Sequence, residues 1–372
     1  MNPAPLTAGR IVLKLGTSTL MAGTERLSPP TMVDLARQVA NVRLAGHEVI
    51  LVSSGAVATG REALGFPQLP KDIPAKQMLA AVGQPRLMAL YERLFALYSV
   101  TVAQVLLTRA DLDNRRSYLN ARNTLAALLR HDLLPIVNEN DTVATEEIRV
   151  GDNDNLSALV ASLVDADLLV LLTDQPGVFT SDPRQNPAAE LIREVVSDEI
   201  PESLWQSAGG TASSVGTGGM VTKLQAAQLA RRSGARVVVA RGSDPEVLSR
   251  IVAGEPIGTQ FSALDSATDR RRRFLLSSSV VGTLAIDDGA AQALRSGGSL
   301  LAVGIAAVEG DFERGDTVRL INESRREVAL GAVNYRSIDL ARLLRRHSDD
   351  IGELLGYDYG DEIIHHDDLV LL

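Results

Sequence analysis

The chain has 372 residues, enough for about two domains, and 45% of them are hydrophobic, which allows a large buried core. It contains no cysteine, which excludes disulfides and cysteine-ligated metal and fits a cytosolic enzyme. No run of 18 uncharged apolar residues occurs, so we expect no membrane-spanning helix, and residues 1–9 show no signal-peptide pattern.

The net charge of −9 is distributed unevenly along the chain. Residues 275–372 hold 9 Arg, no Lys and 17 acidic residues, a balance of −8, so residues 1–274 carry −1. Nucleic-acid binders are expected to be basic, so this argues against a nucleic-acid partner. Only 4 of the 37 basic residues are lysines, and Lys14 and Lys223 both lie in glycine-flanked motifs. A lysine kept in an arginine-rich chain suits a phosphate, which it meets as a compact point charge.

The first predicted strand, 11–15, is apolar except for Lys14 and leads into Gly16-Thr17-Ser18-Thr19. A lysine near the end of a buried strand needs an anionic partner, and Gly16 lets the backbone approach a ligand. The alternative is an edge-strand lysine that reaches solvent. A second strand, 48–52, ends in Ser53-Ser54-Gly55-Ala56, which is either an anion-binding turn or a plain tight turn.

The next part of the chain alternates helical and strand patterns. Helices are predicted over 32–44 and over 75–97, and a further helical pattern runs from the turn after the second strand through Glu62. In the helix over 75–97, Gly83-Gln84-Pro85 predicts a break or kink. A third strand spans 101–107, and within 111–129 Asn120 is predicted to open a helix. Four arginines, at 109, 115, 116 and 122, could meet an acidic ligand, but a solvated face or a subunit contact is more typical.

The densest polar cluster lies between a predicted fourth strand, 133–137, and a helical pattern from Leu156 to Val164. Two stretches, Asn138-Glu139-Asn140-Asp141-Thr142 and Gly151-Asp152-Asn153-Asp154-Asn155, together contain four carboxylates and four carboxamides. Asx-rich turns that cap a helix would explain some of them. So many hydrogen-bonding groups at the end of a strand favour a polar-ligand site, because ligands of open α/β sheets bind at that edge.

The fifth predicted strand, 167–172, is almost wholly apolar, as in strands covered on both faces, and ends in Thr173-Asp174. Residues 208–223 are rich in glycine and serine and lead into a helix, 224–232, and a strand, 236–240. Such a loop at a helix N-terminus favours anions, and Lys223 adds a positive charge. A flexible surface loop is the alternative.

Strands and helices thus alternate, and several strand ends are small, polar or acidic. This pattern predicts a three-layer α-β-α fold with an open, mostly parallel sheet and one ligand crevice along its edge. The G-x-x-x-x-G-K-[ST], G-x-G-x-x-G and H-R-D motifs are missing, so the predicted site must use another arrangement.

After Arg270-Arg271-Arg272-Arg273 the pattern changes to short β-like runs, which predict a small, mostly β second domain. These runs are 282–286, 300–303, 317–321 and 328–333. Near the C-terminus, His365-His366-Asp367-Asp368 suggests a metal. Neighbouring residues of a strand face opposite ways, however, so no metal site is expected there.

The central cluster and four further motifs resemble the glutamate 5-kinase family. The four are Lys14-Leu15-Gly16-Thr17-Ser18, Ser53-Ser54-Gly55-Ala56, Leu171-Leu172-Thr173-Asp174 and Gly216-Thr217-Gly218-Gly219-Met220. The likeness runs from about Arg10 to the C-terminus and includes Leu355-Gly356-Tyr357-Asp358-Tyr359-Gly360. The chain departs from the family at Ser53, where Thr is frequent, at Val221, where Ser is frequent, and in the extra residues before about position 9.

The resemblance implies an N-terminal tail (1–9), an amino-acid kinase domain with the ATP and glutamate sites (10–265), a linker (266–278) and a PUA domain (279–372). It implies a cytoplasmic homodimer or homotetramer that uses ATP and Mg²⁺ to phosphorylate the γ-carboxylate of L-glutamate. The product would be L-glutamyl 5-phosphate, and the reaction would be the first step of proline biosynthesis. The resemblance also implies inhibition by proline.

Carried onto this chain, the family pattern implies Lys14, Lys223 and Asp154 as catalytic residues, with Asp154 holding the two lysines in place. It implies Ser54, Asp141 and Asn153 as the glutamate site and no residue as a direct metal ligand. The implied ATP site comprises Lys14, Gly16, Thr173, Asp174, Thr217, Gly218, Gly219, Met220, Val221, Thr222 and Lys223. Phosphoryl transfer to a carboxylate that is already ionised at pH 7 needs positioning and cations rather than a strong base.

Two alternatives remain from the sequence. One is an amino-acid kinase for a different substrate, namely aspartate, acetylglutamate, carbamate or UMP. The other is an RNA-binding or RNA-modifying protein, because PUA-like domains occur in such proteins, although the acidic C-terminal part argues against it.

Overall fold

A computed structural model describes residues 5–6, 9–70, 72–144, 153–209, 219–264, 275 and 279–372. The chain divides into two compact units, Met1–Ser266 and Ala267–Leu372. The residue-level limits expected for tail, kinase domain, linker and PUA domain stay a prediction. Within the described ranges, no helix has both the length and the apolar character needed to cross a bilayer.

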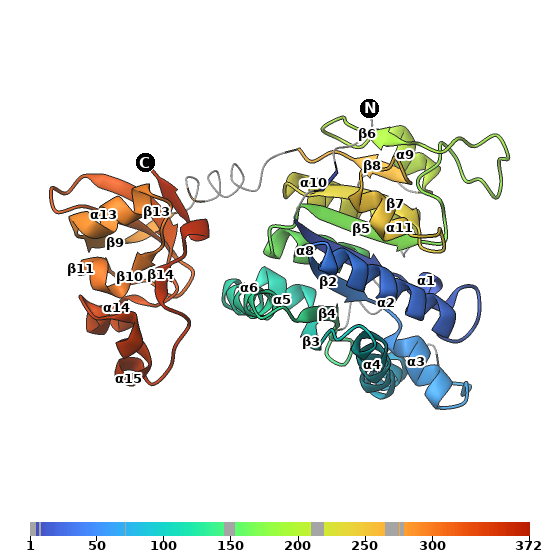
Figure 1. The fold of residues 1–372 in the computed structure, drawn as a ribbon, viewed down its shortest axis with the longest axis horizontal. Coiled ribbons are helices and arrows are strands. Elements are labelled where there is room, and N and C mark those ends of the chain that lie inside the picture. The colour runs from blue at the N-terminus through green and yellow to red at the C-terminus, as the bar shows by residue number, and fades with distance from the viewer. Residues whose placement is uncertain are drawn as a thin grey trace. The chain divides into compact units, whose positions relative to one another are not determined.

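The first unit is built on an eight-stranded sheet with the strand order β3-β4-β2-β1-β5-β7-β8-β6 (Figure 1). Its strands are β1 (Arg10–Leu15), β2 (Glu48–Ser53), β3 (Val102–Leu107), β4 (Leu134–Glu139), β5 (Leu168–Thr173), β6 (Glu194–Val195), β7 (Arg236–Arg241) and β8 (Thr259–Phe261). All neighbours pair in parallel except β7 and β8. The predicted open, mostly parallel sheet is therefore confirmed.

Helices cover both faces of this sheet. They are α1 (Thr17–Met21), α2 (Pro29–Leu44), α3 (Ala56–Ala63), α4 (Ile73–Ala96), α5 (Arg109–Asp113), α6 (Arg115–Arg130), α8 (Asn153–Leu163), α9 (Glu202–Ser207), α10 (Met220–Arg232) and α11 (Val247–Val252).

Two helix predictions differ in detail from the structure. A break or kink is predicted at Gly83-Gln84-Pro85, and the break does not occur, because α4 continues through Pro85. The Arg86 side chain donates to the Val82 carbonyl (3.0 Å) of the same helix. Helix α6 begins at Arg115 and not at Asn120. Its start is set by Asn114, whose Oδ1 accepts from the Ser117 N–H (3.0 Å).

Alternate residues of the central strands pack into two separate cores. Ile11, Leu13 and Leu15 of β1 share a core with residues of α2, α4 and α11, whereas Val12 lies in the core formed with α6, α8 and α10. Successive side chains of a strand point to opposite faces, so Lys14 lies on the same face as Val12. The pleat of β1 therefore directs the Lys14 side chain towards α8 and α10.

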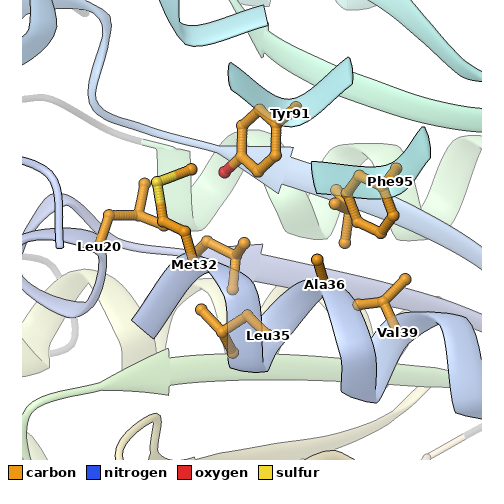
Figure 2. A pocket seen from close by; sticks show the side chains of 9 residues that line it. Leu20, Met32, Leu35, Ala36, Val39, Tyr91 and Phe95 are labelled. Carbon is orange, nitrogen blue, oxygen red and sulfur yellow. The ribbon is translucent and has the colours of Figure 1, made fainter. Parts of the chain in front are cut away.

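A small apolar cavity lies between α2 and α4 (Figure 2). Its lining consists of Leu15, Leu20, Met32, Leu35, Ala36, Val39, Leu51, Tyr91 and Phe95. Burial raises the pKa of Tyr91, so its hydroxyl stays protonated and lies 2.7 Å from Ser53 Oγ. The cavity has apolar walls and is unsuited to a polar ligand. For the site, what matters in this region is the contact of Tyr91 with Ser53, which anchors the end of β2.

The second unit contains a five-stranded sheet, β11-β9-β12-β13-β15, and a two-stranded sheet, β10-β14, which confirms the predicted small, β-rich second domain. Its strands are β9 (Val280–Ile286), β10 (Leu300–Leu301), β11 (Ile305–Gly310), β12 (Thr317–Ile321), β13 (Glu327–Ala332), β14 (Glu362–Ile364) and β15 (Leu369–Leu371). Its helices are α13 (Asp288–Arg295), α14 (Ser337–Leu343) and α15 (Ile351–Leu355), with 3-10 turns η1 (Ala302–Gly304), η2 (Ser348–Asp350) and η3 (His366–Asp368).

Candidate functional site

The candidate site lies where four neighbouring parallel strands end. In the order β4-β2-β1-β5, these strands end at Glu139, Ser53, Leu15 and Thr173. Because the strands are parallel and adjacent, their carboxyl ends meet at one edge of the sheet, which is the edge where open α/β sheets bind ligands.

Asp154 holds the two lysines that the sequence singles out. Its Oδ1 lies 2.6 Å from Lys14 Nζ, and its Oδ2 lies 3.1 Å from Lys223 Nζ. The hydroxyl of Thr222 also donates to Oδ2 (2.7 Å). At most 10% of the Lys14, Lys223 and Asp154 side chains is exposed, so these charges interact with little screening by water. The three charged groups together carry +1, which suits an anionic ligand.

The pKa of Asp154 reflects a competition between burial and its neighbours. Burial by itself would raise this pKa. The positive charges of Lys14 and Lys223, with the hydrogen bonds from Lys14 and Thr222, outweigh burial and lower the pKa to about 2. Since the ordinary value is 3.8, the ionised carboxylate contributes stability above that pH, and this contribution is lost as the pH falls through about 2. Asp154 is therefore a permanent anion at neutral pH.

Local structure explains how these side chains come together. Lys14 points to the face of α8 and α10 through the pleat of β1, Asp154 lies in the first turn of α8, and Lys223 lies in the first turn of α10. The N-cap of α10 is Gly219, whose φ of +93° lies in the left-handed region that favours glycine. At Gly16, a β-carbon would lie 3.3 Å from Lys14 Nζ, so any side chain at this position would crowd the ammonium group.

Asn153, the residue before Asp154, ties together the ends of β2 and β4. Its side-chain amide lies 2.8 Å from the Ser53 carbonyl and 3.0 Å from Ser54 Oγ. The same amide lies 3.0 Å from Asn138 Oδ1 at the end of β4. Of the three residues expected to bind glutamate, the structure thus brings Ser54 and Asn153 into direct contact.

Asp141, the third of these residues, lies in the turn that follows β4 and is half-buried. Burial raises its pKa to about 6, although the nearby Lys76 lowers it in part. Because this pKa exceeds the ordinary value of 3.8, ionisation near neutral pH costs folding free energy. A cationic ligand would offset that cost.

The residues expected to bind the nucleotide differ in accessibility. Thr173 is buried at the end of β5 and its hydroxyl donates to the exposed Asp174 (3.1 Å). The Val221 side chain packs in the hydrophobic core, so only its backbone is available to a ligand. Thr217 and Gly218 lie outside the described residues.

Sequence reasoning missed the residues that support the site from behind. Asn138 is 2% exposed, accepts from the Asn153 amide and donates to Gln84 Oε1 (2.8 Å) on α4. Ser53 donates to the Ser54 carbonyl (2.9 Å) and can accept from Tyr91. The position of Asn138 within the polar cluster could have identified it as a site residue from the sequence. Gln84 and Tyr91 carried none, because they lie dozens of residues away in the chain.

Two family models match successive parts of the chain. Residues 9–241 match the model of the amino acid kinase family, and residues 282–355 match the model of the PUA domain. A glutamate 5-kinase of Deinococcus radiodurans is 54% identical over 364 residues, which cover 98% of this chain and 100% of that protein. A glutamate 5-kinase of Sodalis glossinidius is 52% identical over 362 residues, covering 97% and 98% of the two chains.

The chain belongs to the glutamate 5-kinase family. Family membership confirms the resemblance inferred from the motifs and accounts for the order of the two units. The segment matched by the amino acid kinase model contains Lys14, Asp154 and Lys223, together with Ser54, Asp141 and Asn153. The roles of these residues within the family fold stay a prediction.

We expect Asp154→Asn to lower the free energy of unfolding of the first unit by about 3–5 kcal/mol, because it leaves two buried ammonium groups without their shared anion. Chemical denaturation of the full chain at pH 7, in a buffer without phosphate or sulfate, measures this change. The control is Asp113→Asn, whose side chain is 70% exposed and 3.8 Å from Arg109, with an expected effect below about 0.5 kcal/mol. Equal stability of the two variants would contradict the assigned role of Asp154.

Proposed function

We propose that this protein transfers the γ-phosphoryl group of ATP to the γ-carboxylate of L-glutamate and so produces L-glutamyl 5-phosphate, the first step of proline biosynthesis. The observation that carries the proposal is the buried Lys14–Asp154–Lys223 arrangement at the sheet edge. Identity above 50% over nearly the full length of named glutamate 5-kinases supports the same substrate.

The two lysines would stabilise the transferring phosphoryl group. In phosphoryl transfer, negative charge spreads over the phosphoryl oxygens and the bridging oxygens, and catalysis consists mainly of positioning and of cations held against that charge. Lys14 and Lys223 come from separate segments, and Asp154 fixes both ammonium groups before substrate binds. This pre-organisation removes the need to bring two like charges together during the reaction.

Glutamate would bind beside the lysines at the ends of β2 and β4. Ser54 and Asn153 offer a hydroxyl and an amide, and Asp141 offers a carboxylate whose ionisation an α-ammonium group would favour. Asn153 and Asp154 are consecutive in the first turn of α8, so one helix start serves both substrates. The attacking γ-carboxylate is ionised at neutral pH, so the site needs no strong general base.

The nucleotide would lie on the β1 and β5 side of this edge. Its residues would be Gly16, Thr173, Asp174 and the segment from Thr217 to Lys223, with Lys14 and Lys223 at the phosphates. Gly219 is the N-cap residue of α10. The N–H groups in the first turn of a helix favour phosphate binding.

Mg²⁺ would accompany the nucleotide and neutralise phosphate charge. It prefers oxygen ligands and commonly binds through substrate phosphates. The carboxylate of Asp154 is engaged by two lysines and by Thr222, so we propose that phosphate oxygens and water, rather than Asp154, hold this ion.

Inhibition by proline, assembly into a homodimer or homotetramer, and a cytoplasmic location extend this proposal. A coupled ADP-release assay with ATP, Mg²⁺ and glutamate, repeated with proline, tests the activity and its inhibition together. Aspartate, acetylglutamate, carbamate and UMP serve as competing acceptors in the same assay. Turnover of aspartate without turnover of glutamate would overturn the proposed substrate.

We expect Lys223→Ala to lower kcat by at least ~100-fold with a modest loss of stability, because it removes a charge that acts on the transition state. The control is Arg232→Ala on the same helix, whose side chain is 57% exposed and pairs with Glu199, and it should keep normal turnover. Steady-state kinetics and a thermal melt of each variant measure the two effects. Near-normal turnover of Lys223→Ala would count against the role of this lysine.

The raised pKa of Asp141 predicts a pH dependence of glutamate use. If the ionised carboxylate binds the substrate's ammonium group, kcat/KM for glutamate should rise with pH and level off above about 6. At pH 5 only about one tenth of Asp141 is ionised, so kcat/KM should be roughly tenfold below its plateau. In Asp141→Asn, kcat/KM for glutamate should be low at every pH and should no longer rise with pH. If the rise with pH survives the substitution, it reflects the ionisation of another group.

We further propose that residues 10–265 contain the complete ATP and glutamate sites, so a chain ending at Arg273 should keep measurable glutamate-dependent ADP release. The physical reason is that every residue assigned to the reaction precedes this point. Circular dichroism establishes whether the shortened chain is folded. Complete loss of activity in a folded fragment would mean that the PUA domain contributes to the site.

A further inference from the structure

A second group of reactive side chains lies in the C-terminal unit, after the segment that matches the PUA model. His365, His366 and Asp367 each offer a ligand atom, and these atoms all lie within 4.8 Å of one another. The two imidazole centroids are 4.1 Å apart, and Glu362 Oε1 lies 4.0 Å from His365 Nε2. We call Glu362, His365, His366 and Asp367 the histidine cluster.

The backbone explains why these neighbours share one side of the chain. The predicted strand, in which adjacent side chains diverge, is wrong here, because β14 ends at Ile364 and His366–Asp368 form a 3-10 turn. Such a turn does not alternate its side chains between two faces. Adjacent side chains of this turn can therefore approach the same ion.

Hydrogen bonds already fix the orientation of both imidazole rings. His365 Nδ1 accepts from the Asp367 N–H (3.1 Å), so a neutral His365 ring carries its proton on Nε2. Nδ1, which lies 3.6 Å from Asp367 Oδ2, is then the nitrogen whose lone pair a metal would take in exchange for this bond. The Ser299 hydroxyl accepts from the His366 N–H (2.9 Å) and lies 3.4 Å from His366 Nδ1. His366 Nε2 lies 3.7 Å from Asp367 Oδ1. In metal sites, an oxygen that accepts from one ring nitrogen of a histidine leaves the other nitrogen to bind the ion, and Ser299 can have this role for His366.

The donor set selects a class of ion. Two imidazoles with carboxylates suit zinc and neighbouring transition metals, whereas Mg²⁺ and Ca²⁺ prefer sites made of oxygen ligands alone. Ligands of one tetrahedral zinc ion lie roughly 3.4 Å apart, so the side chains would have to approach by roughly 1 to 1.5 Å. The side chains of His365, His366 and Asp367 are 28%, 52% and 44% exposed, which leaves room for that movement and for bound water.

We propose that the histidine cluster binds one divalent transition-metal ion of the zinc class. The cluster connects β14 of the two-stranded sheet to β15 of the five-stranded sheet, and Ser299 lies directly before β10. All four proposed ligands lie within residues 362–367, so an ion bound there holds the segment that connects β14 to β15. It binds only the folded arrangement, so it stabilises the unit.

Isothermal titration of the metal-free full chain with ZnCl₂, without nucleotide and with excess Mg²⁺, tests this site. We expect one equivalent of zinc to bind, and His365→Ala and His366→Ala each to weaken that binding at least ~10-fold. The control is His347→Ala, which removes an exposed histidine of the same unit and should bind zinc like the wild type. Zinc should also raise the melting temperature of the wild type and not that of His366→Ala.

The substitutions Glu362→Gln and Asp367→Asn keep both histidines and nearly the same shape, so they test the site even if an alanine variant fails to fold. We expect each to weaken zinc binding while circular dichroism stays unchanged. Binding weaker than ~100 μM in the wild type would overturn the proposal. Wild-type zinc affinity in folded His365→Ala and His366→Ala would do so as well, since the zinc would then lie elsewhere.

Discussion

One buried carboxylate determines the arrangement of the first unit's edge. Asp154 pairs with Lys14 from β1 and with Lys223 from α10, at 2.6 Å and 3.1 Å. Two buried ammonium groups would repel each other and would each carry a large desolvation cost. The shared anion removes both problems and still leaves the group with a net charge of +1. Two ammonium groups held in place by one buried carboxylate suit a phosphoryl-transfer enzyme.

The first turn of α8 organises two halves of the proposed active site. Asp154 reaches the lysines on β1 and α10, while Asn153 reaches the ends of β2 and β4 through Ser54 and Asn138. The two residues are consecutive, so the helix backbone sets the distance between the proposed phosphoryl and glutamate positions. In-line transfer would depend on that distance, and hydrogen bonds from Asn153 fix it between the helix start and the strand ends.

The two units of the chain use their charged residues in different ways. In the first unit, lysines are rare and the two at the site are buried, whereas residues 275–372 of the second unit have no lysine and a net charge of −8. Its imidazoles and carboxylates near the C-terminus form the histidine cluster, a donor set for a transition metal rather than for phosphate. The same physical rule applies to both units, because each local set of charges favours a ligand of complementary charge and matching donor type.

The sequence by itself determined the fold class, the six long strands of the first sheet and the family. Those features depend on local hydrophobic periodicity and on motifs that contiguous residues carry. It did not determine that α4 continues through Pro85, that Tyr91 and Gln84 support the site, or that His365 and His366 lie side by side. Only the tertiary structure decided these points, because each depends on contacts or backbone geometry that local sequence does not encode. The pairing of Asp154 with Lys14 and Lys223 lies between these cases: the residue types were visible in the sequence, but packing α8 and α10 on one face of β1 brought them together.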